Sequence, residues 1–180
     1  PRFAATIMPN NSTFQGRPVE CWEGGADGPD KNNASRTGYY LLKYVDPELK
    51  LLQGQSAIHS WIIIRLGEIY LNYAEAMNEA YGPDAKGIYG KSAREAVNEV
   101  RGRVGMPDVV ADSKEEMREK IRHERRVELA FEDHRFWDVR RWMTAPDDLN
   151  APLKGVKVTR LSYNSFEYQS VEVESRSFKR

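Results

Sequence analysis

The sequence predicts a mainly α-helical protein, with a loop-rich opening segment, packed helix pairs in the middle and a β-hairpin at the end. Three observations lead to this prediction. Apolar residues recur at steps of three and four through the middle of the chain, serine-led capping patterns precede two of those stretches, and alternation with period two replaces them near the end. With 180 residues, 40% of them hydrophobic, the chain is long enough to bury one sizeable core.

The opening segment, residues 1–58, is rich in turn-forming residues. The runs 9–12, 24–30 and 31–33 consist largely of Pro, Asn, Ser, Gly and Asp, which favour loops. Residues 39–45 are aromatic and apolar and are bounded by Gly38 and by Asp46-Pro47, so they predict a strand. We therefore expect loops with short strands in this segment.

The middle segment, residues 59–145, carries the helical pattern. A first apolar stripe runs from Ile62 through Leu66 and Ile69 to Met77, and Tyr81-Gly82-Pro83 is a typical helix stop. The capping box that begins at Ser92 predicts a second helix, which stops at 105–107. Because a loop joins these two helices, they predict a helical hairpin.

Two further helices are predicted before the chain changes pattern. One starts at a second capping box at Ser113 and runs toward Phe131, and a short one spans Arg135 to Met143 after a break near Asp133. Residues 146–180 then alternate with period two around the turn 163–165, with valines at 156, 158, 171 and 173. This last segment predicts a β-hairpin.

Charge and composition exclude several classes of protein. Lysine and arginine number 27, as do aspartate and glutamate, so no net field attracts nucleic acid or anionic lipid. The longest apolar run, Trp61 to Ile64, is far shorter than the roughly 20 residues of a membrane-spanning helix. The single cysteine, Cys21, excludes an internal disulfide framework and predicts a small apolar group in the core.

Charged residues on the third predicted helix fall on its apolar side. Continuing the stripe of Met117 and Ile121 places Glu124, Arg125 and Glu128 there, and a charge in such a position must be paired. We predict a buried structural network in which Arg65 or Arg135 is among the partners. The alternative makes these carboxylates acid and base catalysts; we favour the network because structural ion pairs also produce such clusters.

No catalytic or metal-binding pattern is complete. His123-Glu124 begins like a zinc-protease motif, but Val127 stands where the second histidine would be, and the three histidines share no ligand spacing. The acidic loop 27–33 lacks the spacing of a calcium loop, so calcium there is a minority interpretation. We predict no catalytic residue, no metal site and no cofactor.

Aromatic residues in the opening loops suggest a sugar-binding surface. Sugar C–H faces stack on aromatic rings, while sugar hydroxyls need amide or charged partners. The candidate ligand-binding residues are Phe14, Trp22, Asp27, Asn32 and Arg36. The alternative is that Phe14 and Trp22 only pack these loops onto the core. By contrast, Trp137 and Trp142 lie at helical spacing and are predicted to be core residues.

Three stretches together resemble the SusD/RagB family in order and spacing, namely 65–76, 96–106 and 121–132, the last continuing through Trp142. Residues 1–3 and 37–40 also resemble segments of that family. The resemblance implies tetratricopeptide-like helix pairs and identifies the chain as a carboxy-terminal part of such a protein. Asp133 stands where the family commonly has glycine, which predicts a left-handed backbone at that residue.

The resemblance also implies a function. Proteins of this family bind oligosaccharides at the cell surface without cleaving them and pass them to a SusC-like TonB-dependent outer-membrane transporter. They are held at the outer membrane by a lipidated amino-terminal cysteine, which we expect to lie outside this chain. Two alternatives remain at this point: a helical-repeat module that binds only protein partners, and a glycoside hydrolase with two carboxylates.

Overall fold

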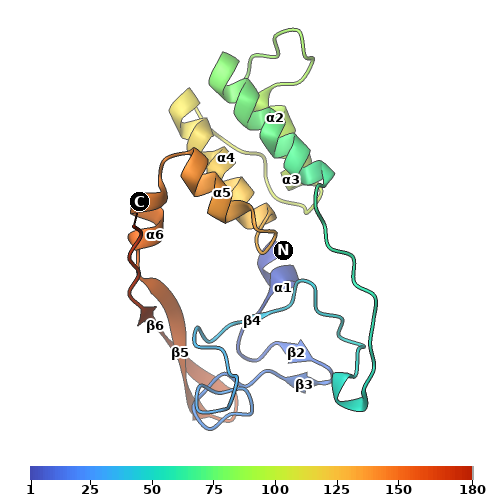
Figure 1. The fold of residues 1–180 in the computed structure, drawn as a ribbon, viewed down its shortest axis with the longest axis vertical. Coiled ribbons are helices and arrows are strands. Elements are labelled where there is room, and N and C mark those ends of the chain that lie inside the picture. The colour runs from blue at the N-terminus through green and yellow to red at the C-terminus, as the bar shows by residue number, and fades with distance from the viewer. Residues whose placement is uncertain (180) are drawn as a thin grey trace. The chain divides into compact units, whose positions relative to one another are not determined.

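The computed structural model describes residues 1–179, and the chain divides into two units (Figure 1). The first unit combines Pro1–Arg2 with Ser60–Asp138, and the second combines Phe3–His59 with the chain from Val139 onward. The predicted first and last segments, 1–58 and 146–180, therefore contribute mainly to the same unit. The exact boundaries of the three predicted segments stay predictions.

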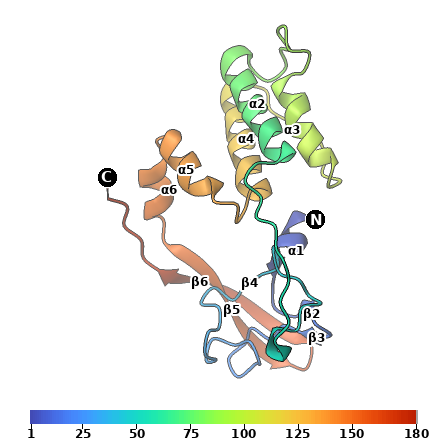
Figure 2. The ribbon, with the colours of Figure 1, turned by 45° about the vertical axis from the view of Figure 1, so that its right-hand side comes forward.

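Three helices build the first unit: α2 (Leu66–Tyr81), α3 (Ala93–Gly102) and α4 (Lys114–Glu128). Helix α2 packs against both α3 and α4, and the three lie side by side in both views (Figures 1 and 2). Their shared core consists of Ala74, Met77, Ala93, Ala96, Val97, Val109, Ala111, Met117 and Ile121. Together with the hairpin of the second unit, these helices confirm a mainly helical fold that ends in a β-hairpin.

The two predicted capping boxes behave differently. Ser92 accepts a hydrogen bond from the backbone N–H of Glu95, and the Glu95 carboxylate accepts one from the backbone N–H of Ser92, so this box is complete. At α4, Ser113 accepts from the N–H of Glu116, but the Glu116 carboxylate accepts from the N–H of Asp112. In the second box, the Glu116 carboxylate therefore bonds to the residue before the N-cap and not to the N-cap itself. Both serines still begin their helices as predicted.

The predicted buried stripe of α2 is wrong at its start. The helix begins at Leu66, not at Ile62, and Leu66 and Ile69 are 66% and 49% exposed. Leu71 occupies the buried position instead and is fully buried, in line with Ala74 and Met77. The cause is long-range, because the face that packs is the one that α3 and α4 cover.

The backbone bends strongly between α4 and the next helix. Helix α5 (His134–Arg141) follows Phe131 and Asp133, whose φ angles are 64° and 62°. The left-handed backbone predicted at Asp133 is confirmed, and Phe131 adds a second such residue, which is unusual for a bulky side chain. Helix α6 (Ala145–Asn150), with a proline in its first turn, was not predicted.

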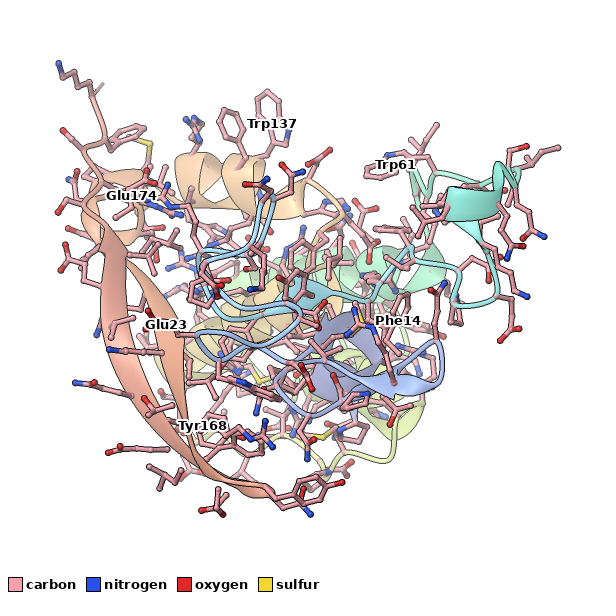
Figure 3. The ribbon with its side chains drawn as sticks, turned by 90° about the horizontal axis from the view of Figure 1, so that it is seen from below. Phe14, Glu23, Trp61, Trp137, Tyr168 and Glu174 are labelled. Atoms are coloured by element: carbon pink, nitrogen blue, oxygen red, sulfur yellow. The ribbon has the colours of Figure 1, made fainter. Side chains whose placement is uncertain are left out.

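The prediction that Trp137 is a core residue is wrong. Its side chain is 66% exposed and projects away from the ribbon, edge to face with the ring of Phe136 at 5.0 Å (Figure 3). Trp142 is half-buried, with the guanidinium of Arg141 5.0 Å from its ring centre. Helical spacing alone did not identify which face of α5 is covered.

Short strands and loops build the second unit. Helix α1 (Arg2–Thr6) leads into β1 (Ile7–Met8), which pairs with β4 (Tyr40–Leu41), while β2 (Thr13–Phe14) pairs with β3 (Arg17–Pro18). A 3₁₀ turn, η1, spans Leu51–Gln53. The predicted strand 39–45 is thus reduced to two residues, because Tyr44 adopts a left-handed φ of 71° that no strand accommodates.

The terminal hairpin pairs β5 (Leu153–Ser162) with β6 (Ser165–Glu174) in antiparallel register around the predicted turn. Its residue Val158 joins Met8, Val19, Cys21 and Trp22 in the core of the second unit. This core therefore combines the opening loops with the end of the chain. Among residues 1–179, no helix combines the length and the apolar character needed to cross a bilayer.

Cys21 lies in this core, only 4% exposed, as the sequence predicted. Burial, assisted by the nearby Asp27 carboxylate, raises the pKa of the Cys21 thiol to about 11. Because the thiolate is the reactive form, we expect iodoacetamide to leave Cys21 unmodified in the native chain at neutral pH. Mass spectrometry should detect alkylation only after unfolding in guanidinium chloride, and rapid modification of the native chain would contradict the buried position.

Candidate functional site

Phe14 is held at the tip of a short hairpin. Between β2 and β3, Gln15 and Gly16 have φ angles of 49° and 80°, a pair of left-handed residues that closes a tight two-residue turn. Phe14 is half-buried and packs against the core that contains Met8 and Trp22. The hairpin therefore holds the half-buried Phe14 ring at the edge of this core.

A groove of about 640 Å³ opens beside Phe14. Its other wall comes from the segment that follows β4, and the lining residues are Phe14, Gln15, Tyr44, Val45, Asp46, Leu49, Lys50, Leu51, Leu52 and Gln53. The side-chain amide of Gln15 donates to the carbonyl oxygen of Leu49 at 3.1 Å and so connects the two walls. The groove combines apolar and aromatic walls with a few amide and charged groups, which is the composition of a small-molecule or sugar site.

Tyr44 gives the groove its second aromatic ring. Its left-handed backbone turns the chain sharply after β4, and its ring lies edge-on to the imidazole of His59, with 5.3 Å between ring centres. The ammonium group of Lys43 lies 5.8 Å from the centre of the same ring. Tyr44 was not predicted as a site residue, because its only signal in the sequence was an aromatic side chain within the predicted strand.

Asp27 forms hydrogen bonds within the opening loops and does not line the groove. Its carboxylate accepts two hydrogen bonds from Arg17, at 2.6 and 2.7 Å, and a third from the backbone N–H of Glu20 at 2.9 Å. The hydrogen bonds from Arg17 are the largest cause of a lowered pKa of the Asp27 carboxyl. The hydroxyl of Tyr40 donates to the Asp27 carbonyl at 2.8 Å. Asp27 thus fixes the conformation of the loop that follows Trp22.

The remaining predicted ligand residues do not meet at the groove. Arg36 donates to the Glu174 carboxylate at 3.2 Å and to the Val173 carbonyl at 3.3 Å, so it joins its loop to the end of β6. Asn32 lies exposed in the same loop region. Of the five residues that the sequence suggested, Phe14 lines the groove and the other four lie elsewhere in the second unit.

The position of Trp22 favours the packing alternative. It is 9% exposed, its ring lies 5.2 Å from that of Phe166, and the guanidinium of Arg160 lies 5.1 Å from its ring centre. A backbone bridge also joins Trp22 to Val158. With two neighbours on its ring and little exposed surface, Trp22 packs within the core of the second unit.

The first unit contains a dense charge network around α4. Glu124, Arg125, Glu128 and Glu132 are between 1% and 6% exposed. Arg65 donates to Glu128 at 2.7 Å and to both carboxylate oxygens of Glu132 at 2.7 and 2.8 Å. Glu132 lies between the two left-handed residues, Phe131 and Asp133. The bend before α5 therefore contains the glutamate that pairs with Arg65.

Further arginines, which were not predicted from the sequence, complete the network. Arg2 binds Glu124 and also Glu128, the latter at 3.1 Å, while Arg101 donates to Glu124 and Arg103 to Glu128, each at 2.8 Å. No pattern in the sequence connects Arg2 with α4. The contacts arise only when the chain folds.

Arg125 and Arg135 line the same small pocket beside α4. Arg125 donates to both carboxylate oxygens of Asp138, at 3.0 and 3.1 Å, and to the side-chain oxygen of Asn72. The pocket has a volume of about 220 Å³, and Arg135 lines it together with Arg125 and Asp138. Arg125 therefore belongs to a separate buried pair rather than to the Arg65 cluster.

The electrostatics of the network do not suit acid catalysis. Burial alone would raise the pKa of Glu128, but the hydrogen bonds and charges of Arg65, Arg2 and Arg103 outweigh it and hold the pKa below its usual range. A general acid needs the opposite shift, toward neutral pH. Among residues 1–179, no group of three His, Cys, Asp or Glu side chains has the arrangement of a metal site.

Comparisons with known proteins agree on one family. The model of the SusD family matches residues 1–180. A SusD-like protein from Bacteroides fragilis NCTC 9343 is 35% identical, with a TM-score of 0.83 over 99% of this chain and 34% of its own. A SusD-like carbohydrate-binding protein from the same organism is 29% identical, with a TM-score of 0.74 over 99% of this chain and 37% of its own.

The chain thus spans about a third of the length of these solved structures. No curated protein sequence matches it.

Proposed function

The chain belongs to the SusD family, and from this premise we propose that it forms part of the glycan-binding surface of a protein that captures oligosaccharides outside the cell. The observation that carries the proposal is the groove beside Phe14, where two aromatic rings face a small set of polar groups. A structurally similar protein described as carbohydrate-binding supports it.

In this proposal the rings of Phe14 and Tyr44 stack on the apolar faces of sugar rings. Gln15, Asp46 and Lys50 supply the amide, carboxylate and ammonium groups that bind hydroxyls at the rim. Asn32 adds an exposed amide from the neighbouring loop region. Asp27 and Arg36 act indirectly, because their ion pairs hold the loops in place.

We further propose that the protein binds glycans without cleaving them. The carboxylates of Glu124, Glu128 and Glu132 are engaged with arginines, and their side chains are only 1% to 2% exposed. Incubating the chain with its bound oligosaccharide should therefore release no new reducing ends. Release of such ends would instead support the glycoside hydrolase alternative.

The family resemblance extends the proposal to cellular context. The full-length protein would be lipid-anchored at the outer-membrane surface and would pass its glycan to a SusC-like TonB-dependent transporter. Copurification of such a transporter with the full-length protein tests this assignment. If a glycan array detects no binding at all and only protein partners copurify, the helical-repeat interaction module becomes the better description.

Replacing Phe14 by alanine should weaken glycan binding about fivefold to tenfold, since an aromatic stacking contact contributes roughly 1 kcal/mol. Isothermal titration of the chain with the oligosaccharide that binds most strongly on an array measures the change. We expect weak affinity, with a dissociation constant on the order of 1 mM, because each imperfectly paired hydroxyl costs desolvation energy.

Tyr163→Ala is the matched control, because Tyr163 is an aromatic residue of the same unit that is 81% exposed and lies outside the groove. Its affinity should equal that of the wild type. If Phe14→Ala binds as tightly as the wild type while Tyr163→Ala loses affinity, the groove is not the binding site.

A further inference from the structure

The β5–β6 hairpin has one occupied edge and one open edge. On the β5 side, the N–H of Val156 donates to the Thr37 carbonyl at 2.9 Å, and Val158 bridges to Trp22. On the β6 side, no other strand among residues 1–179 pairs with it. Arg36 reaches only its last residues, at Val173 and Glu174, where the register shifts.

The register shows which backbone groups face this open edge. Because the Val156 N–H points to Thr37, it points away from β6, and residues opposite each other in an antiparallel pair share the same hydrogen-bonding orientation. Ser170 lies opposite Val156, and with period two Tyr168 and Phe166 follow the same pattern. The N–H and C=O groups of these three residues are therefore directed toward the open edge.

This edge has the properties of a template for another strand. A two-stranded sheet is marginal in water, and Thr159 to Ser162 at the far end of β5 are exposed. Proline residues and β-bulges commonly prevent pairing at a sheet edge. From Ser165 to Val171 this edge contains no proline, and its only irregularity lies beside the turn, between Arg160 and Ser162 on β5.

Charge selects the partner. Strand β6 contains Glu167, Glu172 and Glu174 and no lysine or arginine, whereas β5, its natural neighbour, contains Lys154, Lys157 and Arg160 and no acidic residue. Pairing β6 with β6 of a second copy would bring glutamates together, and like charges across a strand pair are destabilising. The β5 edge of a second copy is already occupied by Thr37 and Trp22.

We propose that β6 is a docking edge for an extended segment of another protein that bears lysine or arginine and adds as a third strand. Main-chain hydrogen bonds to Phe166, Tyr168 and Ser170 would supply the affinity. Because Glu174 is bonded to Arg36 and Glu172 lies opposite Lys154, Glu167 would supply the charge preference. The proposal does not depend on glycan binding, because the groove beside Phe14 contains no residue of β6.

The test uses the full chain and a short fluorescent peptide of alternating lysine and threonine, followed by fluorescence anisotropy. Ser170→Pro removes one outward N–H while the bonds between β5 and β6 remain, and it should weaken binding about tenfold. Ser170→Ala keeps that N–H and should bind like the wild type. A peptide of alternating glutamate and threonine should not bind.

A second variant covers the case in which Ser170→Pro disturbs the hairpin. Glu167→Lys leaves the backbone unchanged and should weaken the basic peptide while allowing the acidic peptide to bind. The proposal is overturned if the basic peptide fails to bind the wild type, if Ser170→Ala loses as much affinity as Ser170→Pro, or if Glu167→Lys does not change the preference.

Discussion

Replacing Arg125 by alanine is expected to destabilise the first unit by about 3 to 5 kcal/mol, the cost of breaking a buried ion pair from one side. Arg125 is 3% exposed, and its guanidinium donates to both oxygens of Asp138, which is 4% exposed. The substitution leaves the Asp138 carboxylate buried without this guanidinium. Chemical denaturation followed by circular dichroism measures the free energy of unfolding.

Arg118 provides a matched control on the same helix. Its guanidinium also donates to both oxygens of one carboxylate, that of Glu79, but the two side chains are 28% and 41% exposed. Arg118→Ala should therefore cost less than about 1 kcal/mol, as is usual for a pair at the surface. Equal and small losses for the two variants would mean that burial of the Arg125 pair does not determine stability.

Replacing Trp22 by alanine should destabilise the second unit by about 3 to 5 kcal/mol, the range for removing a large aromatic side chain from a core. The ring packs on Phe166 and joins the core around Val158. In a glycan titration of Trp22→Ala, the apparent affinity should decrease only as much as the fraction of folded protein decreases. Trp22→Phe keeps part of the packing and should lose less stability.

The same variant separates two roles of Trp22 that the sequence left open. If Trp22→Ala keeps the stability of the wild type but loses glycan affinity, the ring contacts the ligand rather than the core. Tyr163→Ala should change neither quantity, because its ring is 81% exposed. Together these variants distinguish a loss of folding from a loss of binding within one unit.

Local patterns predicted much of the fold, and the reason is visible at Ser92. A capping box joins residues three positions apart, so its sequence signature and its hydrogen bonds coincide. The terminal hairpin was predictable for the same reason, since its alternation and turn are contiguous. By contrast, the outward positions of Leu66 and Trp137 depend on which helix face finds a neighbour, and periodicity does not contain that information.

The candidate site was less predictable, because it depends on contacts between distant segments. Phe14 carried a signal as an aromatic residue among amides, but the opposite wall of the groove comes from Tyr44 to Gln53, whose pattern suggested only a strand end. Likewise, α4 predicted that Glu124 and Glu128 need partners, and Arg2 was not among the expected ones. The predicted partner Arg65 does bind Glu128, whereas Arg2, Arg101 and Arg103 were not predicted, because no local pattern in the sequence connects them with α4.

The interleaved course of the chain has a consequence for biosynthesis and for dissection into fragments. The chain passes between the units at Arg2, at His59 and at Asp138, so neither unit is one continuous segment. During synthesis, Arg2 is made well before its partners Glu124 and Glu128, and the loops around Trp22 are made before β5, so these contacts form only after the later segments have been synthesised. A protease cut near residue 59 would therefore leave the two products held together, each contributing to both units.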